Sequence, residues 1–279
     1  MKVDKFRTVI IYIIIILLGL VCLLPLLNIV AISFSSSAAV EGNMVGLIPV
    51  GFSTAAYKKI LEDSQFWHSF LISVERVVLT LIINFVLIVL MAYPLSKTNA
   101  QFRGRNIYAN LMIFAMLFNG GMIPTFLLVK SYGLLNTVWA LVLPGAVPIF
   151  NVILVMNFFA AVPKELEEAA FIDGANPLQV LTKIFIPISK PVLATVSLFS
   201  IVGSWNDFYS GLIYMSKAAY YPLMTYIQSL QINVEDLIKQ GNLSAVVDSA
   251  SLGNTNLNAA KIVVAVIPLL LIYPLLQRY

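Results

Sequence analysis

The sequence has 279 residues, of which 60% are hydrophobic and only 11% are charged, and its mean hydropathy is +0.92. Soluble domains carry about 25% charged residues, so this composition excludes a soluble globule, a disordered chain and a collagen-like fibre. The single Cys22 excludes an internal disulfide, and the single His68 excludes a metal site built from several histidines. The net charge of +4 comes from basic residues scattered between apolar runs, which is typical of a membrane protein and argues against nucleic-acid binding.

Six apolar stretches are each long enough to cross the hydrocarbon core of a bilayer, which takes about 20 residues in a helix. The first follows three basic residues, as in a signal peptide, but it is too long for one and no cleavage site follows closely. We therefore expect an uncleaved anchor and an all-α membrane protein, a single domain over residues 1–279. The six expected transmembrane helices are residues 8–32, 77–96, 106–129, 131–163, 191–216 and about 260–277.

The lysines and arginines are divided unevenly between alternate loops. Ten of the 17 lie in the N-terminal segment, in the second–third and fourth–fifth loops and at Arg278. Because short cytoplasmic loops carry the excess of basic residues, both termini are expected to be cytoplasmic. Residues 33–66 and about 217–259 are then external loops, and the second of these either touches a partner protein or packs on its own bundle. Lys261, at the edge of the sixth span, is expected to extend its side chain to the headgroups.

The cytoplasmic loop of about residues 163–190 predicts two short helices. Pro163 suits the first position of a helix, and Gly174 is a typical residue to follow its last turn. Asn176 suits the cap of a second helix, and Pro187 is expected to end it. A connection with two capped helices is more ordered than a simple linker needs.

The first of these helices has Leu166, Ala169 and Ala170 on one face at helical spacing. The alanines leave room for another backbone to approach closely, so the helix is either a docking element for a protein or an amphipathic linker on the headgroups. Acidic residues in the same helix oppose contact with an anionic leaflet and favour a protein partner.

This loop resembles the EAA loop of permease subunits in bacterial ABC importers. The residues are Glu168-Ala169-Ala170, three residues, Gly174, nine residues and Ile184-Phe185-Ile186-Pro187, with Ile186 where the family has leucine. The resemblance extends over most of the chain. Asp173-Gly174-Ala175 and Gly203-Ser204-Trp205-Asn206-Asp207-Phe208 resemble the carbohydrate branch, near the MalG-type maltose permease. Gly120-Gly121-Met122-Ile123-Pro124-Thr125 resembles a subgroup that moves complex or acidic oligosaccharides.

The resemblance implies an importer subunit of the bacterial plasma (inner) membrane that works by alternating access. Its expected partners are two ATPase subunits, a second, homologous permease, an extracytoplasmic solute-binding protein, membrane lipid and an oligosaccharide substrate. The sequence contains no GxxxxGK[ST] phosphate-binding loop, so no cofactor is expected in this chain, and ATP and Mg belong to the ATPases. Family members usually carry a tail after the sixth span, whereas this sequence ends at Tyr279. The residues that the resemblance implies for ATPase coupling are Glu168, Ala169, Ala170, Asp173, Gly174, Ile184 and Pro187.

Asp207 is the one charged residue of the fifth apolar stretch. A carboxylate at the bilayer centre costs roughly 2.5–3.5 kcal/mol, but at 1.5 Å per residue Asp207 comes ~25 Å after Lys190, near the outer end. With Trp205, Asn206 and Tyr209 it belongs either to the translocation pathway or to an interfacial cluster that caps and anchors the helix. Interhelical hydrogen bonds are expected for Asn84, Asn119, Asn151 and Asn157.

Two rival functions need features that the sequence lacks. An ion-coupled secondary transporter, the alternative function, would need ionisable residues near the midplane and repeat symmetry, for which Asp207 alone is a candidate. An intramembrane zinc protease needs HExxH, which is absent, and a serine protease needs a histidine within the spans, whereas His68 lies at an edge. We therefore predict no catalytic residue and no metal site in this chain. An ATPase that co-purifies with it would distinguish the importer from the secondary transporter.

Overall fold

The structure, a computed structural model, describes residues 2–118, 120–230 and 255–277, and these ranges contain helices but no strand. The expected all-α class is therefore confirmed. The chain divides into two compact units, Met1–Trp67 with Tyr226–Pro268 and His68–Thr225 with Leu269–Tyr279. Asn119 and the middle of the expected second external loop, residues 231–254, lie outside the described residues.

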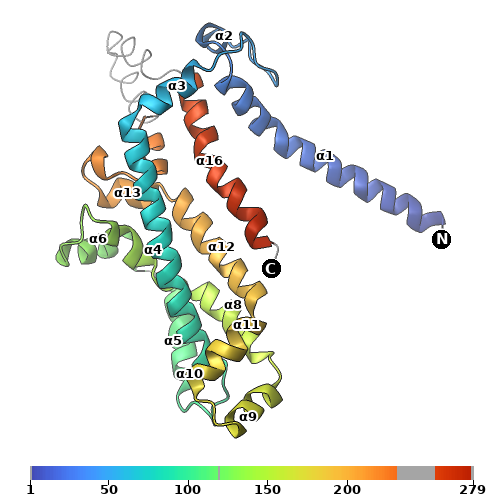
Figure 1. Cartoon of the computed structure of the whole chain (residues 1–279), viewed down its shortest axis with the longest axis vertical. Helices are drawn as coiled ribbons and strands as arrows, with labels where there is room; N and C mark the ends of the chain where they lie inside the picture. Colours follow the sequence, from blue (N-terminus) through green and yellow to red (C-terminus); the bar gives the residue numbers. More distant parts are fainter. Residues whose placement is uncertain (1, 119, 231–254, 278–279) are drawn as a thin grey trace. The chain divides into compact units, whose positions relative to one another are not determined.

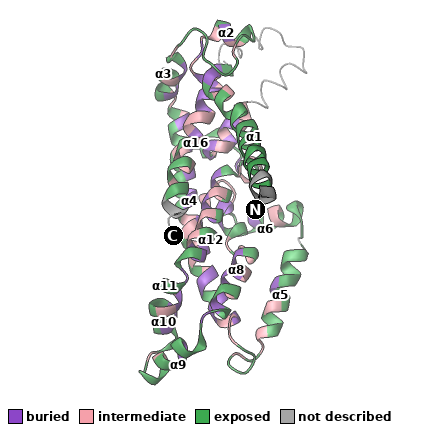
Figure 2. Ribbon diagram, turned by 90° about the vertical axis from the view of Figure 1, so that its right-hand side faces the viewer, coloured by how far each residue is buried: buried purple, intermediate pink, exposed green. Residues whose placement is uncertain are grey.

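The first unit contains a long helix, α1, whose apolar residues occupy every side. Side chains of isoleucine, leucine and valine are exposed along most of its length (Figure 2). A helix that is apolar all round suits lipid or another membrane-embedded chain rather than water. The unit also contains α2, α3, the first turn of α4 and most of α16; the bounds are α1 (Lys2–Ser33), α2 (Ser37–Glu41), α3 (Ala55–Glu62), α4 (Ser64–Leu95) and α16 (Thr255–Gln277).

Lys261 of α16 does not extend to the headgroups, contrary to the prediction. It is 3% exposed, and its Nζ donates to Oδ2 of Asp63 at 2.7 Å and to the Tyr226 hydroxyl at 3.2 Å. The Tyr226 hydroxyl also donates to Asp63, at 2.9 Å. Asp63 lies 198 residues away in sequence. Its carboxylate compensates the buried charge of the lysine, so the ammonium group does not need contact with water.

The second unit is built around α4, α8 and α12. Ile88 of α4, Val152 and Val155 of α8 and Val196 of α12 belong to one buried apolar cluster. At one end of α4 lie α9, α10 and α11, and α13 lies toward the other end (Figure 1). The remaining bounds are α5 (Arg105–Leu117), α6 (Met122–Ser131), α7 (Val138–Val142), η1 (Leu143–Gly145), α8 (Ile149–Ala160), α9 (Lys164–Ile172), α10 (Pro177–Val180), η2 (Leu181–Phe185), α11 (Ile186–Ile188), α12 (Lys190–Asn206), α13 (Tyr209–Tyr214) and η3 (Ala218–Tyr220).

Three of the described helices, α1, α4 and α16, are long and apolar enough to cross a membrane, and the number rises to six if each bent helix pair is one span. One such pair consists of α7 with η1 and α8, which meet at 47°. Pro144 and Pro148 lie at this break. A proline removes a backbone donor and its ring clashes with the preceding turn, so the two prolines account for the interruption of the helix. The count of six spans therefore stays a prediction.

The loop after α8 folds as two successive helical segments. Gly174 follows α9 with φ +81°, a left-handed conformation that glycine adopts without a Cβ penalty. Asn176 caps α10 in a reciprocal capping box with Gln179. These two predicted boundaries are confirmed. Pro163, however, is the N-cap of α9 rather than its first helical residue.

Pro187 lies one residue before the end of the second helix, so the predicted end is displaced by one residue. It lies inside α11, directly after the π-helical turn η2, and the helix continues to Ile188. The axis then bends by 84° into α12. Sharp bends occur at prolines and at π-turns, and this bend falls at Ser189, between the end of α11 and the start of α12.

Candidate functional site

The residues expected to bind an ATPase gather around α9 and the turn that follows it. Ala170, Asp173, Gly174 and Ile184 line one hollow of about 480 Å³ between α9 and η2. Glu168 and Ala169 are exposed on α9, and Pro187 is exposed on α11 without lining this hollow. A carboxylate and small side chains on an exposed helix, beside a concave surface, leave room for a protein partner to approach.

Glu167, next to the exposed Glu168, turns the opposite way and is 8% exposed. Its carboxylate accepts a hydrogen bond from Lys97 Nζ at 2.6 Å and one from the Tyr93 hydroxyl at 3.3 Å. The sequence did not indicate that Glu167 and Lys97, which are 70 residues apart, pair with each other. The available signal was an acidic residue on the inward face of a short amphipathic helix, opposite the basic end of the second span.

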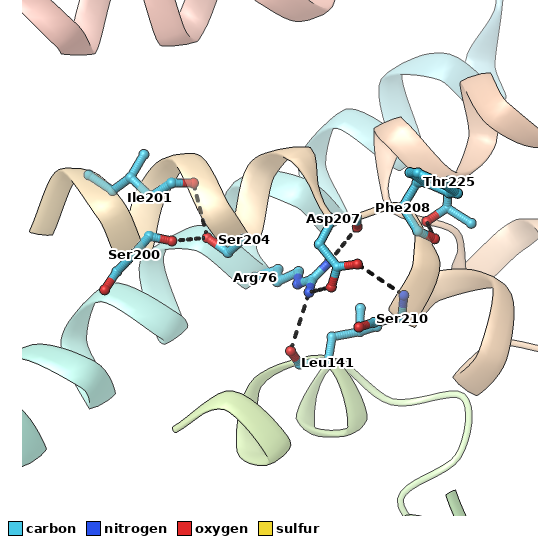
Figure 3. Close-up of polar contacts among 9 residues, drawn as sticks. All are labelled: Arg76, Leu141, Ser200, Ile201, Ser204, Asp207, Phe208, Ser210 and Thr225. Atoms are coloured by element: carbon cyan, nitrogen blue, oxygen red, sulfur yellow. Dashed lines mark hydrogen bonds and ion pairs between the residues drawn. The ribbon is translucent and has the colours of Figure 1, made fainter. Parts of the chain in front are cut away.

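Asp207 follows the last residue of α12 and pairs with Arg76 of α4 (Figure 3). The Arg76 guanidinium donates to Asp207 Oδ2 at 2.5 Å and to the Asp207 carbonyl at 2.9 Å, and it lies 3.5 Å from the carbonyl oxygen of Leu141. The other carboxylate oxygen accepts from the amide of Ser210 at 3.1 Å, at the start of α13. The Asp207 carboxylate therefore bonds both Arg76 and the start of α13, and Arg76 joins backbone carbonyls of two interrupted helices.

A polar pocket of about 220 Å³ adjoins this ion pair. Polar side chains reach it at helical spacing from α4 and α12, so both helices present a polar stripe in an otherwise apolar bundle. The buried Nε of Arg76 and Oγ1 of Thr80 have no hydrogen-bond partner among the described residues. Buried polar groups are normally satisfied, so this pocket suits water or a hydroxyl-bearing ligand. Its polar lining side chains are Arg76, Thr80, Asn84, Asn151, Ser200, Ser204 and Asp207.

Asn84 makes the predicted interhelical contact, because its side-chain amide lies 3.2 Å from the Ser200 hydroxyl of α12. In the amide orientation that satisfies its neighbours, its nitrogen donates to the carbonyl oxygens of Gly145 at 3.3 Å and Ala146 at 3.0 Å. These carbonyls belong to the break between α7 and α8, where regular helical bonds are lost. Asn157, in contrast, is exposed.

The four predicted pathway residues do not form one cluster. Asp207 lines the polar pocket, whereas Trp205 is buried with its ring 5.7 Å from that of Phe70. The Tyr209 hydroxyl donates to the sulfur of Met122 at 3.0 Å, and Asn206 is exposed. Successive residues around the end of a helix point in different directions, so proximity in sequence did not place them together.

Known proteins are similar to this chain over almost its whole length. The family model for a binding-protein-dependent transport system inner membrane component matches residues 2–279. The protein LplC of Bacillus subtilis is 40% identical over 94% of this chain and 87% of its own length. The polygalacturonan/rhamnogalacturonan transport system permease protein YtcP of the same organism is 39% identical over 99% of this chain and 95% of its own.

A solved structure of a bacterial ABC transporter involved in the import of the acidic polysaccharide alginate is similar throughout. The TM-score is 0.87 at 32% identity, and the match covers 100% of this chain and 98% of that one. The chain therefore belongs to the family of binding-protein-dependent transport system inner membrane components, and it is a non-catalytic permease subunit of an ABC transporter whose ATP hydrolysis occurs on separate subunits.

Proposed function

We propose that the chain is one of two permease subunits of an importer that moves an oligosaccharide into the cell by alternating access. Two ATPase subunits would hold the loop around α9, and an extracytoplasmic binding protein would deliver the sugar. The termini and α9 would then face the cytoplasm. The observation that carries the proposal is the folded loop itself, in which capped helices present exposed Glu168 and Ala169 beside the hollow lined by Gly174.

The movement of a short rigid helix suits such a coupling. Packed interfaces switch between discrete arrangements, so displacement of α9 by a partner would shift whole helices of the second unit rather than deform them locally. The hollow of about 480 Å³ gives the partner a concave surface, and Gly174 removes a side chain where the backbone turns.

We propose further that the substrate is acidic. The support lies in the relatives, one named for polygalacturonan and rhamnogalacturonan transport and one structure described for alginate import. In membranes that contain the whole complex, binding protein loaded with oligogalacturonate or alginate oligosaccharides should stimulate ATP hydrolysis. Maltotriose at the same concentration should not. Equal stimulation by the neutral sugar would contradict this substrate class.

The polar pocket is proposed as part of the translocation pathway in place of the four-residue cluster. Asp207 and Thr80 would present hydrogen-bonding groups to sugar hydroxyls, and the partly exposed carboxylate of Asp207 gives access to the pocket. Trp205 is not included, because its ring packs inside the second unit.

Ala169→Trp tests the coupling role of α9. Because Ala169 is exposed, the large ring should leave folding and membrane insertion intact while it blocks close approach of an ATPase. We expect binding-protein-stimulated ATP hydrolysis of the purified complex to fall at least tenfold, following the loss of a close-packed contact. Ala100→Trp, at an exposed position in the loop after α4, is the matched control and should retain activity. Unchanged coupling in Ala169→Trp would refute the proposed contact.

A further inference from the structure

Three side chains join α9 to the end of α4 inside the second unit, and we call Tyr93, Lys97 and Glu167 the inner clamp. Both the ammonium of Lys97 and the hydroxyl of Tyr93 donate to the same oxygen, Oε1 of Glu167. The side chains of Lys97 and Glu167 are only 11% and 10% exposed. On an open surface, side-chain entropy and water cancel most of the attraction of an ion pair, whereas this pair is largely shielded from water.

Aromatic rings surround the cation of the inner clamp. Lys97 Nζ lies 4.0 Å from the ring centroid of Tyr93 and 4.3 Å from that of Phe185 in η2, within the range of cation–π attraction. The Phe185 ring meets Tyr93 and Phe159 of α8 edge-on, with centroids 5.1 Å and 5.4 Å apart. Burial lowers the pKa of the Lys97 ammonium, and Glu167 offsets only part of this effect. The rings thus fix the position of the lysine.

The inner clamp gives α9 a second connection to the bundle. Along the chain, α9 reaches α12 only through the left-handed turn at Gly174, the π-turn η2 and an 84° bend. Through Glu167, it is joined directly to the end of α4, which is one continuous helix. At 1.5 Å per residue, Arg76 lies ~26 Å from Tyr93 along that helix, beside the polar pocket.

We propose that the inner clamp transmits displacement of α9 to α4, so that Lys97 and Glu167 are positioning residues in the coupling of ATP hydrolysis to transport. The inference rests on the proposed importer function, and it adds a route that the EAA pattern does not include. Glu168 faces outward to the partner, whereas Glu167 holds the same helix to its own subunit.

The test uses the whole complex in proteoliposomes with its binding protein, and it measures sugar transported per ATP hydrolysed. Lys97→Gln and Glu167→Gln should each lower this ratio at least fivefold while the ATPase still co-purifies. Lys97→Arg should keep the ratio within about twofold, because arginine also pairs with carboxylates and stacks on aromatic rings. As controls, Arg103→Gln in the loop after α4 and Glu75→Gln on α4 remove exposed charges. Both variants should leave the ratio unchanged.

A neutral pair separates transmission from stability. Replacing a buried ion pair by uncharged residues is often harmless to folding, because no lone charge is left behind. The double variant Lys97→Met with Glu167→Gln should therefore assemble with an unchanged melting temperature and still show the fivefold loss in coupling. A wild-type ratio in this variant would overturn the proposal, and so would failure to assemble, because the contact would then serve folding. If the wild-type complex recruits no ATPase, the proposed function itself fails.

Discussion

Two ion pairs, Arg76–Asp207 and Lys97–Glu167, have different surroundings; Arg76 lies on α4, and Lys97 follows the end of α4, 21 residues further along the chain. In the inner clamp, both charged side chains are about nine-tenths buried, and aromatic rings enclose the lysine. In the other pair, Arg76 is 4% exposed but Asp207 is 29% exposed and borders a polar pocket. The inner pair has the features of a fixed joint. The Arg76–Asp207 pair, which we call the outer pair, joins interrupted helices beside a pocket that water or a ligand can enter.

Hydrogen bonding shows the same difference. Around Arg76, a guanidinium nitrogen and the hydroxyl of Thr80 are buried without a partner among the described residues, although the carbonyls at the two helix breaks are satisfied. The oxygen of Glu167 that lies in the inner clamp accepts two hydrogen bonds. Fully satisfied polar clusters rigidify a core, whereas unsatisfied groups mark places where something else binds or where the structure changes. Three substitutions test how these buried charges and hydroxyls contribute to stability and transport.

The largest effect is expected for Arg76→Gln. This change leaves the Asp207 carboxylate without its cation and weakens the bonds to two backbone carbonyls, so about 3–5 kcal/mol of stability should be lost. Thermal unfolding of the purified complex, monitored with a thiol-independent fluorescence probe, measures the loss. Arg76→Lys should recover part of it. A stability change below about 1 kcal/mol in Arg76→Gln would show that the outer pair does not hold the helix breaks together.

A third ion pair, Asp63 with Lys261 in the first unit, provides a pH-dependent reference. Burial raises the pKa of the Asp63 carboxyl, but hydrogen bonds from Lys261, from the Phe66 amide and from Tyr226 outweigh burial and hold the pKa below its ordinary value. Since the folded-state pKa is the lower one, this stability is present above the unfolded pKa of about 3.9 and is lost as the pH falls through the folded value.

Asp63→Asn should therefore cost about 1.5–3 kcal/mol at pH 7, the range for hydrogen bonds to a charged group, and less at pH 3. Melting temperatures of the two proteins across pH 3–7 give the comparison, with Glu62→Gln, an exposed neighbour, as the control. A difference that stays constant down to pH 3 would mean that the carboxylate charge contributes nothing to this contact.

The smallest effect on stability is expected for Thr80→Val, which replaces the unpartnered hydroxyl by a methyl group of nearly the same shape. Because no hydrogen bond within the described residues is lost, stability should change by less than about 1 kcal/mol. Transport should nevertheless fall severalfold, since the pocket loses a group for sugar or water. Normal uptake would remove Thr80 from the pathway and leave the pocket as packing. Val78→Thr, on the exposed side of α4, is the matched control.

Much of the helical framework was predictable, because local chemistry decides it. A charge-free apolar stretch has few options other than a membrane helix, and the part of α1 that is apolar enough to cross a membrane, Arg7–Ser33, matches the expected span of residues 8–32. Gly174 ends α9 because it has no side chain and adopts a left-handed turn, and the Asn176 side chain caps the start of α10. Both effects are local, so the sequence could place these boundaries. The end of the second helix, at Ile188, lies one residue beyond the predicted end at Pro187, which is within the usual variation of a helix boundary.

The partners of the buried charges were not predictable. Arg76 and Asp207 are 131 residues apart, and Lys97 and Glu167 are 70 apart. The sequence placed Asp207 near the outer end of the fifth apolar stretch, but it did not indicate which of the distant cations pairs with it. For Lys261, the expected contact with headgroups was replaced by Asp63, because the fold brings that carboxylate within 2.7 Å.

The membrane class, the apolar helices and the spacing of the coupling loop follow from the sequence, because hydropathy, caps and helix stops act over a few residues. The packing of distant segments settled that Glu167 is buried while Glu168 is exposed, and that the helix which carries Arg76 also carries Tyr93 of the inner clamp. The physical reason is that burying a charge is costly without a partner, and packing between distant segments is what provides the partner.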